Sequence, residues 1–223
     1  GIEPQVSTSF QLSAWSAAYA VFALLAGSAT VLGAAAPAAE RSQNLSPPYR
    51  DRMLWIALAA CPSVLWLGVV NTLSQNLAPI PFLWILPLSI YLLSFILCFD
   101  REGWYRPEVF RIIMPAAWIL LCFCLARQSS GIGLKMAVLL LSTGLFACCM
   151  FCHGELARRK PHPDQLTCNF LMIALGGALG GAFVGLAAPA LFSGYLELPL
   201  GVTACIILGM GLLYGYPPRR LAR

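Results

Sequence analysis

Residues 148–189 read CCMFCHGELARRKPHPDQLTCNFLMIALGGALGGAFVGLAAP, and they join two long apolar segments through a short basic connection. The connection carries Arg158, Arg159, Lys160 and His162. Each flanking segment is close to the roughly 20 apolar residues that a membrane-spanning helix needs. A basic connection between two spans favours the cytoplasmic side of the membrane. We therefore expect a helical hairpin that crosses a membrane twice and turns in the cytoplasm.

The composition extends this expectation to the whole chain. Of the 223 residues, 59% are hydrophobic and 10% are charged, whereas a soluble domain has about 25% charged residues. The mean hydropathy is +0.77. The apolar runs are continuous, unlike the short alternating segments of a membrane β-barrel. The fold class that follows is an all-α transmembrane bundle, and the net charge of +5 belongs to its loops rather than to a nucleic-acid partner.

The apolar runs predict about seven spans in a single transmembrane domain over residues 1–223. Basic and non-basic connections alternate along the chain, which places the N-terminus outside and the C-terminus in the cytoplasm. The expected spans are residues 12–36, 53–72, 82–99, 112–126, 134–157, 165–191 and 200–216.

The segment Cys149-Met150-Phe151-Cys152-His153 matches the C-x-x-C-H pattern of c-type haem attachment. Three observations argue against haem at Cys149, Cys152 and His153. The pattern lies at the end of an apolar span, the predicted topology puts it on the cytoplasmic side, and no second axial ligand is near it. The other cysteines lie in apolar runs, where a free thiol behaves as a small hydrophobe. We expect no disulfide framework, no metal site and no cofactor.

Two polar groups are candidate contact sites. His153, Glu155 and Arg158 end the fifth span, and the i,i+3 spacing lets Glu155 pair with Arg158. They form either a polar site at the membrane surface that holds a ligand or a partner, or simply the polar end of a span. Asn71, Gln75 and Asn76 either line a polar cavity on the outer side or belong to a helix end.

Glycines mark one helix for close packing. Gly177, Gly181 and Gly185 recur every four residues, and Gly176 and Gly180 form a second row beside them. Small residues at this spacing let two membrane helices approach closely. We therefore expect these five glycines to lie at helix contacts.

Several motifs together carry a family resemblance. They are His153-Gly154-Glu155-Leu156-Ala157, Pro161, Leu166-Thr167, Gly176-Gly177-Ala178-Leu179-Gly180-Gly181, the run from Pro81 to Leu88, and the run from Tyr91 to Phe95. They resemble the membrane region of bacterial spermidine synthase-like integral membrane proteins, in which a major-facilitator-like membrane part is fused to a spermidine synthase domain. The resemblance implies a multi-pass protein of the bacterial inner membrane. It also implies a C-terminal cytoplasmic domain with a glycine-rich loop and an acidic catalytic pair, and the chain carries neither. The chain therefore resembles the membrane half of the family.

The leading hypothesis is a non-catalytic membrane domain that anchors or scaffolds a synthase-like domain or other membrane subunits. A transporter-like module for a small cation such as a polyamine is the first alternative. No Asp, Glu, Lys or Arg lies at the centre of an expected span, although ion-coupled transporters usually have such a residue. A haem or redox protein that uses Cys149, Cys152 and His153 is the second alternative. No catalytic constellation is recognisable in the chain.

Overall fold

The computed structural model describes residues 8–34, 47–76, 84–101, 103–127, 133–192 and 194–214, except for the side chains of residues 8–9, 29–34, 75–76 and 134. All regular structure in these residues is helical. The chain divides into two compact units, Gly1–Leu45 and Ser46–Arg223. The described residues of the first unit form helix α1 (Thr8–Ala34), whose apolar stretch Phe10–Ser28 is long enough to cross a membrane.

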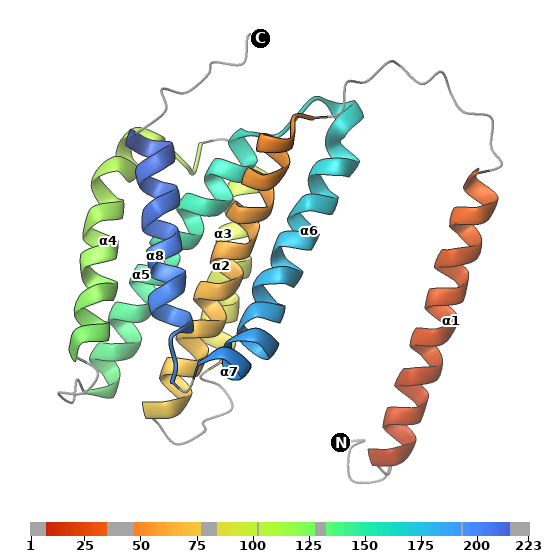
Figure 1. Cartoon of the computed structure of the whole chain (residues 1–223), viewed down its shortest axis with the longest axis horizontal. Coiled ribbons are helices and arrows are strands. Elements are labelled where there is room, and N and C mark those ends of the chain that lie inside the picture. Colours follow the sequence, from red (N-terminus) through yellow and green to blue (C-terminus); the bar gives the residue numbers. More distant parts are fainter. Residues whose placement is uncertain are drawn as a thin grey trace. The chain divides into compact units, whose positions relative to one another are not determined.

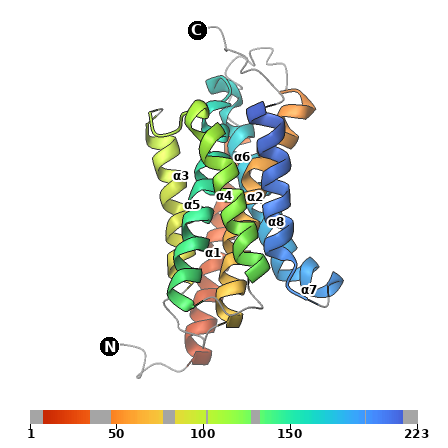
Figure 2. The same ribbon diagram turned by 90° about the vertical axis from the view of Figure 1, so that its left-hand side faces the viewer.

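The second unit is a bundle of helices that lie side by side (Figures 1 and 2). Its elements are α2 (Tyr49–Asn76), α3 (Ile85–Asp100), α4 (Pro107–Arg127), α5 (Leu134–Arg158), a 3-10 turn (Pro163–Gln165), α6 (Leu166–Ala182), a π-helix (Phe183–Ala187), α7 (Ala188–Leu191), α8 (Glu197–Gly209) and a second π-helix (Met210–Tyr214). Figure 2 shows the short α7 turning away from the end of the bundle.

The helices agree with a multi-pass membrane protein. Six helical segments in the described residues are long and apolar enough to span a membrane. The third expected span, residues 82–99, falls on α3, which is apolar but has only 16 residues. Residues 82 and 83 lie outside the described part. The described residues therefore contain the expected apolar helices in coarse form: one helix of spanning length in the first unit, and five such helices and one shorter apolar helix in the second.

Helix α2 organises the second unit. It contacts α6 on one side and α5, α8 and α3 on the others, and Figure 1 shows it between α5 and α6. Leu58 and Leu65 of α2 are fully buried, as are Leu145 and Phe151 of α5. Helix α8 approaches α2 closely, because a Cβ at Gly68 would lie 3.0 Å from the backbone of Leu198. A side chain at that position would separate the two helices.

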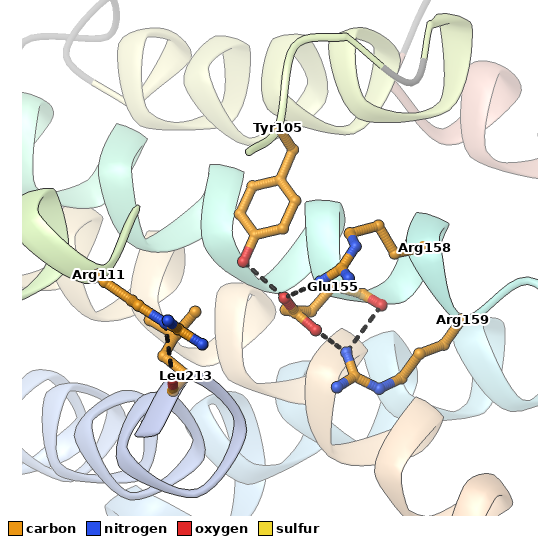
Figure 3. Close-up of polar contacts among 6 residues, drawn as sticks. All are labelled: Tyr105, Arg111, Glu155, Arg158, Arg159 and Leu213. Atoms are coloured by element: carbon orange, nitrogen blue, oxygen red, sulfur yellow. Dashed lines mark hydrogen bonds and ion pairs between the residues drawn. The ribbon is translucent and has the colours of Figure 1, made fainter. Parts of the chain in front are cut away.

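The π-helix that follows α8 is tied to the beginning of α4. The Arg111 guanidinium donates from Nε to the carbonyl oxygen of Leu213 at 2.9 Å (Figure 3). In the opposite direction, the Tyr214 hydroxyl donates to the carbonyl oxygen of Arg111. The last turn of a helix leaves carbonyl groups without an intrahelical partner, and the Arg111 side chain donates to one of them.

The two ends of the bundle differ in charge. One end, uppermost in Figure 1, contains the beginnings of α2, α4 and α6 and the ends of α3 and α5. The other end carries Arg127 and Lys135. The remaining basic residues of the described part of this unit lie at the first end: Arg50, Arg52, Arg101, Arg106, Arg111, Arg158, Arg159 and Lys160.

Candidate functional site

A buried carboxylate lies near the last turn of α5. Glu155 is 1% exposed, and its Oε1 accepts a hydrogen bond from the Tyr105 hydroxyl at 2.7 Å and one from Arg158 Nη1 at 2.9 Å. Arg159 Nη1 pairs with Oε2 and also donates to the Glu155 backbone oxygen at 3.2 Å. Figure 3 shows the carboxylate between the phenol and the two guanidinium groups. We call these four residues the Glu155 cluster.

Tyr105 covers this end of α5. It lies in the connection between α3 and α4, is 5% exposed, and packs its ring against Phe110 with centroids 4.7 Å apart. The ring lies directly on Gly154, where a Cβ would come within 2.2 Å of Tyr105 Cγ. Only glycine leaves room for the ring at this position. The absence of a side chain at Gly154 therefore allows the Tyr105 phenol to reach the carboxylate of the neighbouring Glu155.

The negative charge of Glu155 is balanced within the cluster by two arginines. The guanidinium groups of Arg158 and Arg159 remain partly exposed while they contact a carboxylate with 1% exposure. Burial raises the pKa of the Tyr105 hydroxyl above its usual value, so the phenol stays protonated and can donate. Burial also lowers the pKa of Arg159, an effect that Tyr105 and Asp51 oppose. The Tyr105 hydroxyl reaches this carboxylate from the α3–α4 connection, so its hydrogen bond holds that connection against α5.

These contacts bear on part of the sequence interpretation. The predicted pair of Glu155 and Arg158 is present. His153 and Glu155 were expected at the membrane surface, and in the bundle each is only 1% exposed. Glu155 lies against Tyr105 of the α3–α4 connection and His153 against Ser94 of α3, while the depth of both residues in the membrane stays a prediction. Tyr105 was missed, and its one signal in the sequence was an aromatic residue next to Arg106 in that connection.

His153 belongs to a different environment. Its Nδ1 lies 2.9 Å from Ser94 Oγ of α3, and the rings of Tyr91 and Phe95 meet the imidazole edge-on with centroids at 5.2 Å. Ser94 has a single hydroxyl proton, and its donation to the Tyr91 carbonyl leaves its oxygen to accept from Nδ1–H. His153 thus ties α5 to α3, and it shares no contact partner with the Glu155 cluster.

The haem pattern is enclosed in the bundle. Cys149 and Cys152 have 0% exposure, and both lie on α5 together with His153. The His153 ring is already engaged by Ser94. A covalently attached haem would need the two thiols and this ring at one open face. The residues therefore do not fit a c-type haem. All nine cysteines are free thiols.

The two glycine rows face different surroundings. A Cβ at Gly176 would lie 2.4 Å from the Ile56 carbonyl oxygen, and one at Gly180 would lie 2.7 Å from that of Ala60, so this row packs against α2. A Cβ at Gly177, Gly181 or Gly185 would meet nothing within 4 Å. Ser63 also donates to the Gly177 carbonyl at 3.0 Å. The row of three glycines, Gly177, Gly181 and Gly185, is therefore the one that faces away from α2.

The third group of predicted residues is only partly described. Asn71 lies half-buried on α2. The side chains of Gln75 and Asn76, and the connection that follows them, lie outside the described residues, so the expected polar cavity stays a prediction.

Three cysteines that are far apart in the sequence come together in the core. Cys61 of α2, Cys152 of α5 and Cys205 of α8 place their sulfur atoms within 4.8 Å of one another. We call these three residues the thiol cluster. Their distances along the chain show no metal-ligand spacing, because each residue comes from a different helix.

Comparison of the chain with protein-family models, with curated proteins and with solved structures found no match. The functional argument therefore rests on the geometry of the bundle.

Proposed function

We propose that this chain is a non-catalytic domain of the bacterial inner membrane that anchors or scaffolds a partner, with its N-terminus outside and its C-terminus in the cytoplasm. The distribution of charge supports this orientation. Basic side chains gather at the end of the bundle that contains the Glu155 cluster, and positively charged connections remain on the cytoplasmic side during insertion.

The outward face of α6 is the observation that carries the anchoring proposal. Only 17% of the apolar stretch within Pro163–Leu191 is buried in the bundle. Gly177, Gly181 and Gly185 on this face have no neighbour where a side chain would begin. Lipid tails cover an ordinary apolar face equally well, but a row of glycines creates a shallow surface on which a second helix can approach the backbone. We infer that another membrane helix packs there.

The resemblance described above supplies the nature of the partner. A cytoplasmic synthase-like domain, or a membrane subunit that carries one, would lie at the basic end of the bundle. The Glu155 cluster supports this role because it stiffens that end: it joins the α3–α4 connection to α5 through a carboxylate with three partners. A rigid end gives an attached domain a defined position.

Substitution on α6 tests the proposal. The full chain is isolated from its native membrane into lipid nanodiscs and its mass is measured by native mass spectrometry. We expect a stoichiometric partner or a second copy in the wild type, and its loss in Gly181→Leu, because the leucine fills the shallow surface. Ala182→Leu places the same leucine at an exposed position of α6 about 100° round the helix from Gly181 and is the control.

A single-chain mass for the wild type, or a complex that survives Gly181→Leu, would refute the scaffold. Equal loss in Ala182→Leu would show a general effect of bulk on α6 and would also refute the scaffold surface. The orientation has its own measurement. A membrane-impermeant thiol reagent applied to intact cells should label Lys135→Cys and spare Lys160→Cys, and the reverse pattern would contradict it.

A further inference from the structure

The thiol cluster is built from three helices that pack around the core. Cys61 has 4% exposure, and Cys152 and Cys205 have 0%. Their sulfur atoms all lie within 4.8 Å of one another. Cys61 Sγ also lies 3.8 Å from the carbonyl oxygen of Gly201 on α8. Isolated buried cysteines act as small hydrophobes, but three sulfurs that converge from α2, α5 and α8 form a set of ligands.

Two further groups point at the same place. Cys148 lies one helical turn before Cys152, so both sulfurs lie on one face of α5, and Cys148 is in contact with Cys205. Trp118 of α4 is 7% exposed, and its indole Nε1 has no hydrogen-bond partner among the described residues. This buried N–H lies beside Cys205.

We propose that Cys61, Cys152 and Cys205 form a buried binding site for a thiophilic metal cation, Cu⁺ or Zn²⁺. Thiolate sulfur is the ligand that selects these ions. A Zn–S bond is about 2.3 Å long, which places the sulfurs of a tetrahedral site roughly 3.8 Å apart. The observed spacing is therefore within about 1 Å of a ligating geometry, a difference that small side-chain rotations cover.

The two ions require different numbers of sulfur ligands. The three converging sulfurs complete the trigonal arrangement that Cu⁺ accepts. Zn²⁺ takes four ligands in a structural site, and Cys148, one helical turn before Cys152 on α5, is the candidate for the fourth. In either case each ligating thiol gives up its proton as the metal binds. The bound ion would join α2, α5 and α8 in the core, which goes beyond the proposed anchoring function and does not depend on it.

The experiment uses the full chain, purified without oxygen and held in lipid nanodiscs. Cu⁺ and Zn²⁺ are titrated in separate series against coloured chelators. We expect one ion per chain, with an affinity that falls by at least about 100-fold in Cys61→Ser, Cys152→Ser or Cys205→Ser, since even losing an outer-shell partner costs 10–100-fold. Cys124→Ser is the control, because Cys124 is equally buried but lies on α4 outside the cluster.

Cys148→Ser distinguishes the ions. Loss of Zn²⁺ binding in this variant identifies a four-sulfur zinc site, and unchanged Cu⁺ binding identifies a three-sulfur copper site. X-ray absorption of the loaded wild type needs no variant to fold, and we expect only sulfur neighbours around the metal. The proposal is overturned if neither ion binds at one per chain, if nitrogen or oxygen neighbours dominate the spectrum, or if Cys124→Ser weakens binding as much as the cluster variants do.

Discussion

Gly154 offers the sharpest test of how the bundle closes at its basic end. In Gly154→Ala the new Cβ would lie 2.2 Å from Cγ of Tyr105 and 2.4 Å from Cδ2. These atoms are at the root of the ring or next to it, so a rotation of the side chain cannot clear the clash. The α3–α4 connection that carries Tyr105 must move away from α5 to make room.

The magnitude follows from three contributions. Overpacking of a filled site costs about 1–3 kcal/mol. Moving Tyr105 also weakens its hydrogen bond to a charged acceptor, a class of bond worth about 1.5–3 kcal/mol. Alanine returns up to about 1 kcal/mol through its higher helix propensity. We therefore expect Gly154→Ala to lower the free energy of unfolding by about 2–4 kcal/mol.

The assay is unfolding in mixed micelles, followed by circular dichroism as the denaturing detergent is increased. Gly177→Ala is the control, because its Cβ would meet nothing within 4 Å and should leave the stability unchanged or slightly higher. In a Tyr105→Phe background, Gly154→Ala should cost less, because the phenol contact is already absent. A Gly154→Ala protein within about 0.5 kcal/mol of wild type would refute the packing of Tyr105 on α5.

Two further predictions concern the polar contacts of α5. Burial raises the pKa of the Tyr105 hydroxyl, so the folded state holds this proton more tightly than the unfolded state does. The resulting stabilisation is complete at pH values below the pKa of the unfolded state, which is near 10. It is lost progressively as the pH rises above that value. Between about pH 10 and pH 11 the unfolding free energy should therefore fall by about 1 kcal/mol more in wild type than in Tyr105→Phe. Parallel curves for the two proteins would contradict this prediction. Ser94→Ala removes the hydrogen-bond partner of His153 and should lower the free energy of unfolding by about 1–3 kcal/mol in the same detergent assay. Ser142→Ala deletes a buried hydroxyl with no partner among the described residues and should leave the free energy of unfolding unchanged. Equal effects of the two variants would argue against the His153 contact.

The helices were predictable because a membrane span is a local property of the sequence. About 20 consecutive apolar residues are sufficient to indicate one, and the segments around Leu65 and Leu145 show them clearly. The bounds were less definite at the basic end, where the apolar pattern put the beginning of the fourth span at residue 112 or nearer Pro107, and α4 begins at Pro107. Polar residues such as Arg111 extend a helix beyond its apolar part, and hydropathy does not register them.

The contacts of α5 could be predicted only in part. Glu155 and Arg158 are three residues apart on one helix, so their pairing follows from helical geometry. The burial of Glu155 depends on Tyr105, which is 50 residues away. The thiol cluster depends on how α2, α5 and α8 pack together, and the spacing of the cysteines along the chain does not indicate this packing. Similarly, Gly176 and Gly177 begin rows of equal periodicity, and only the position of α2 decides which row is covered.

The paired hydrogen bonds between Arg111 and the π-helix after α8 affect how the bundle would resist a pulling force on the chain. The guanidinium of Arg111 binds the Leu213 carbonyl, and Tyr214 binds the Arg111 carbonyl in return. Tension on the chain at Tyr214 would therefore load both bonds together and pass into the first turn of α4, instead of unwinding α8 one residue at a time. The bundle would resist such a pull with two helices rather than one.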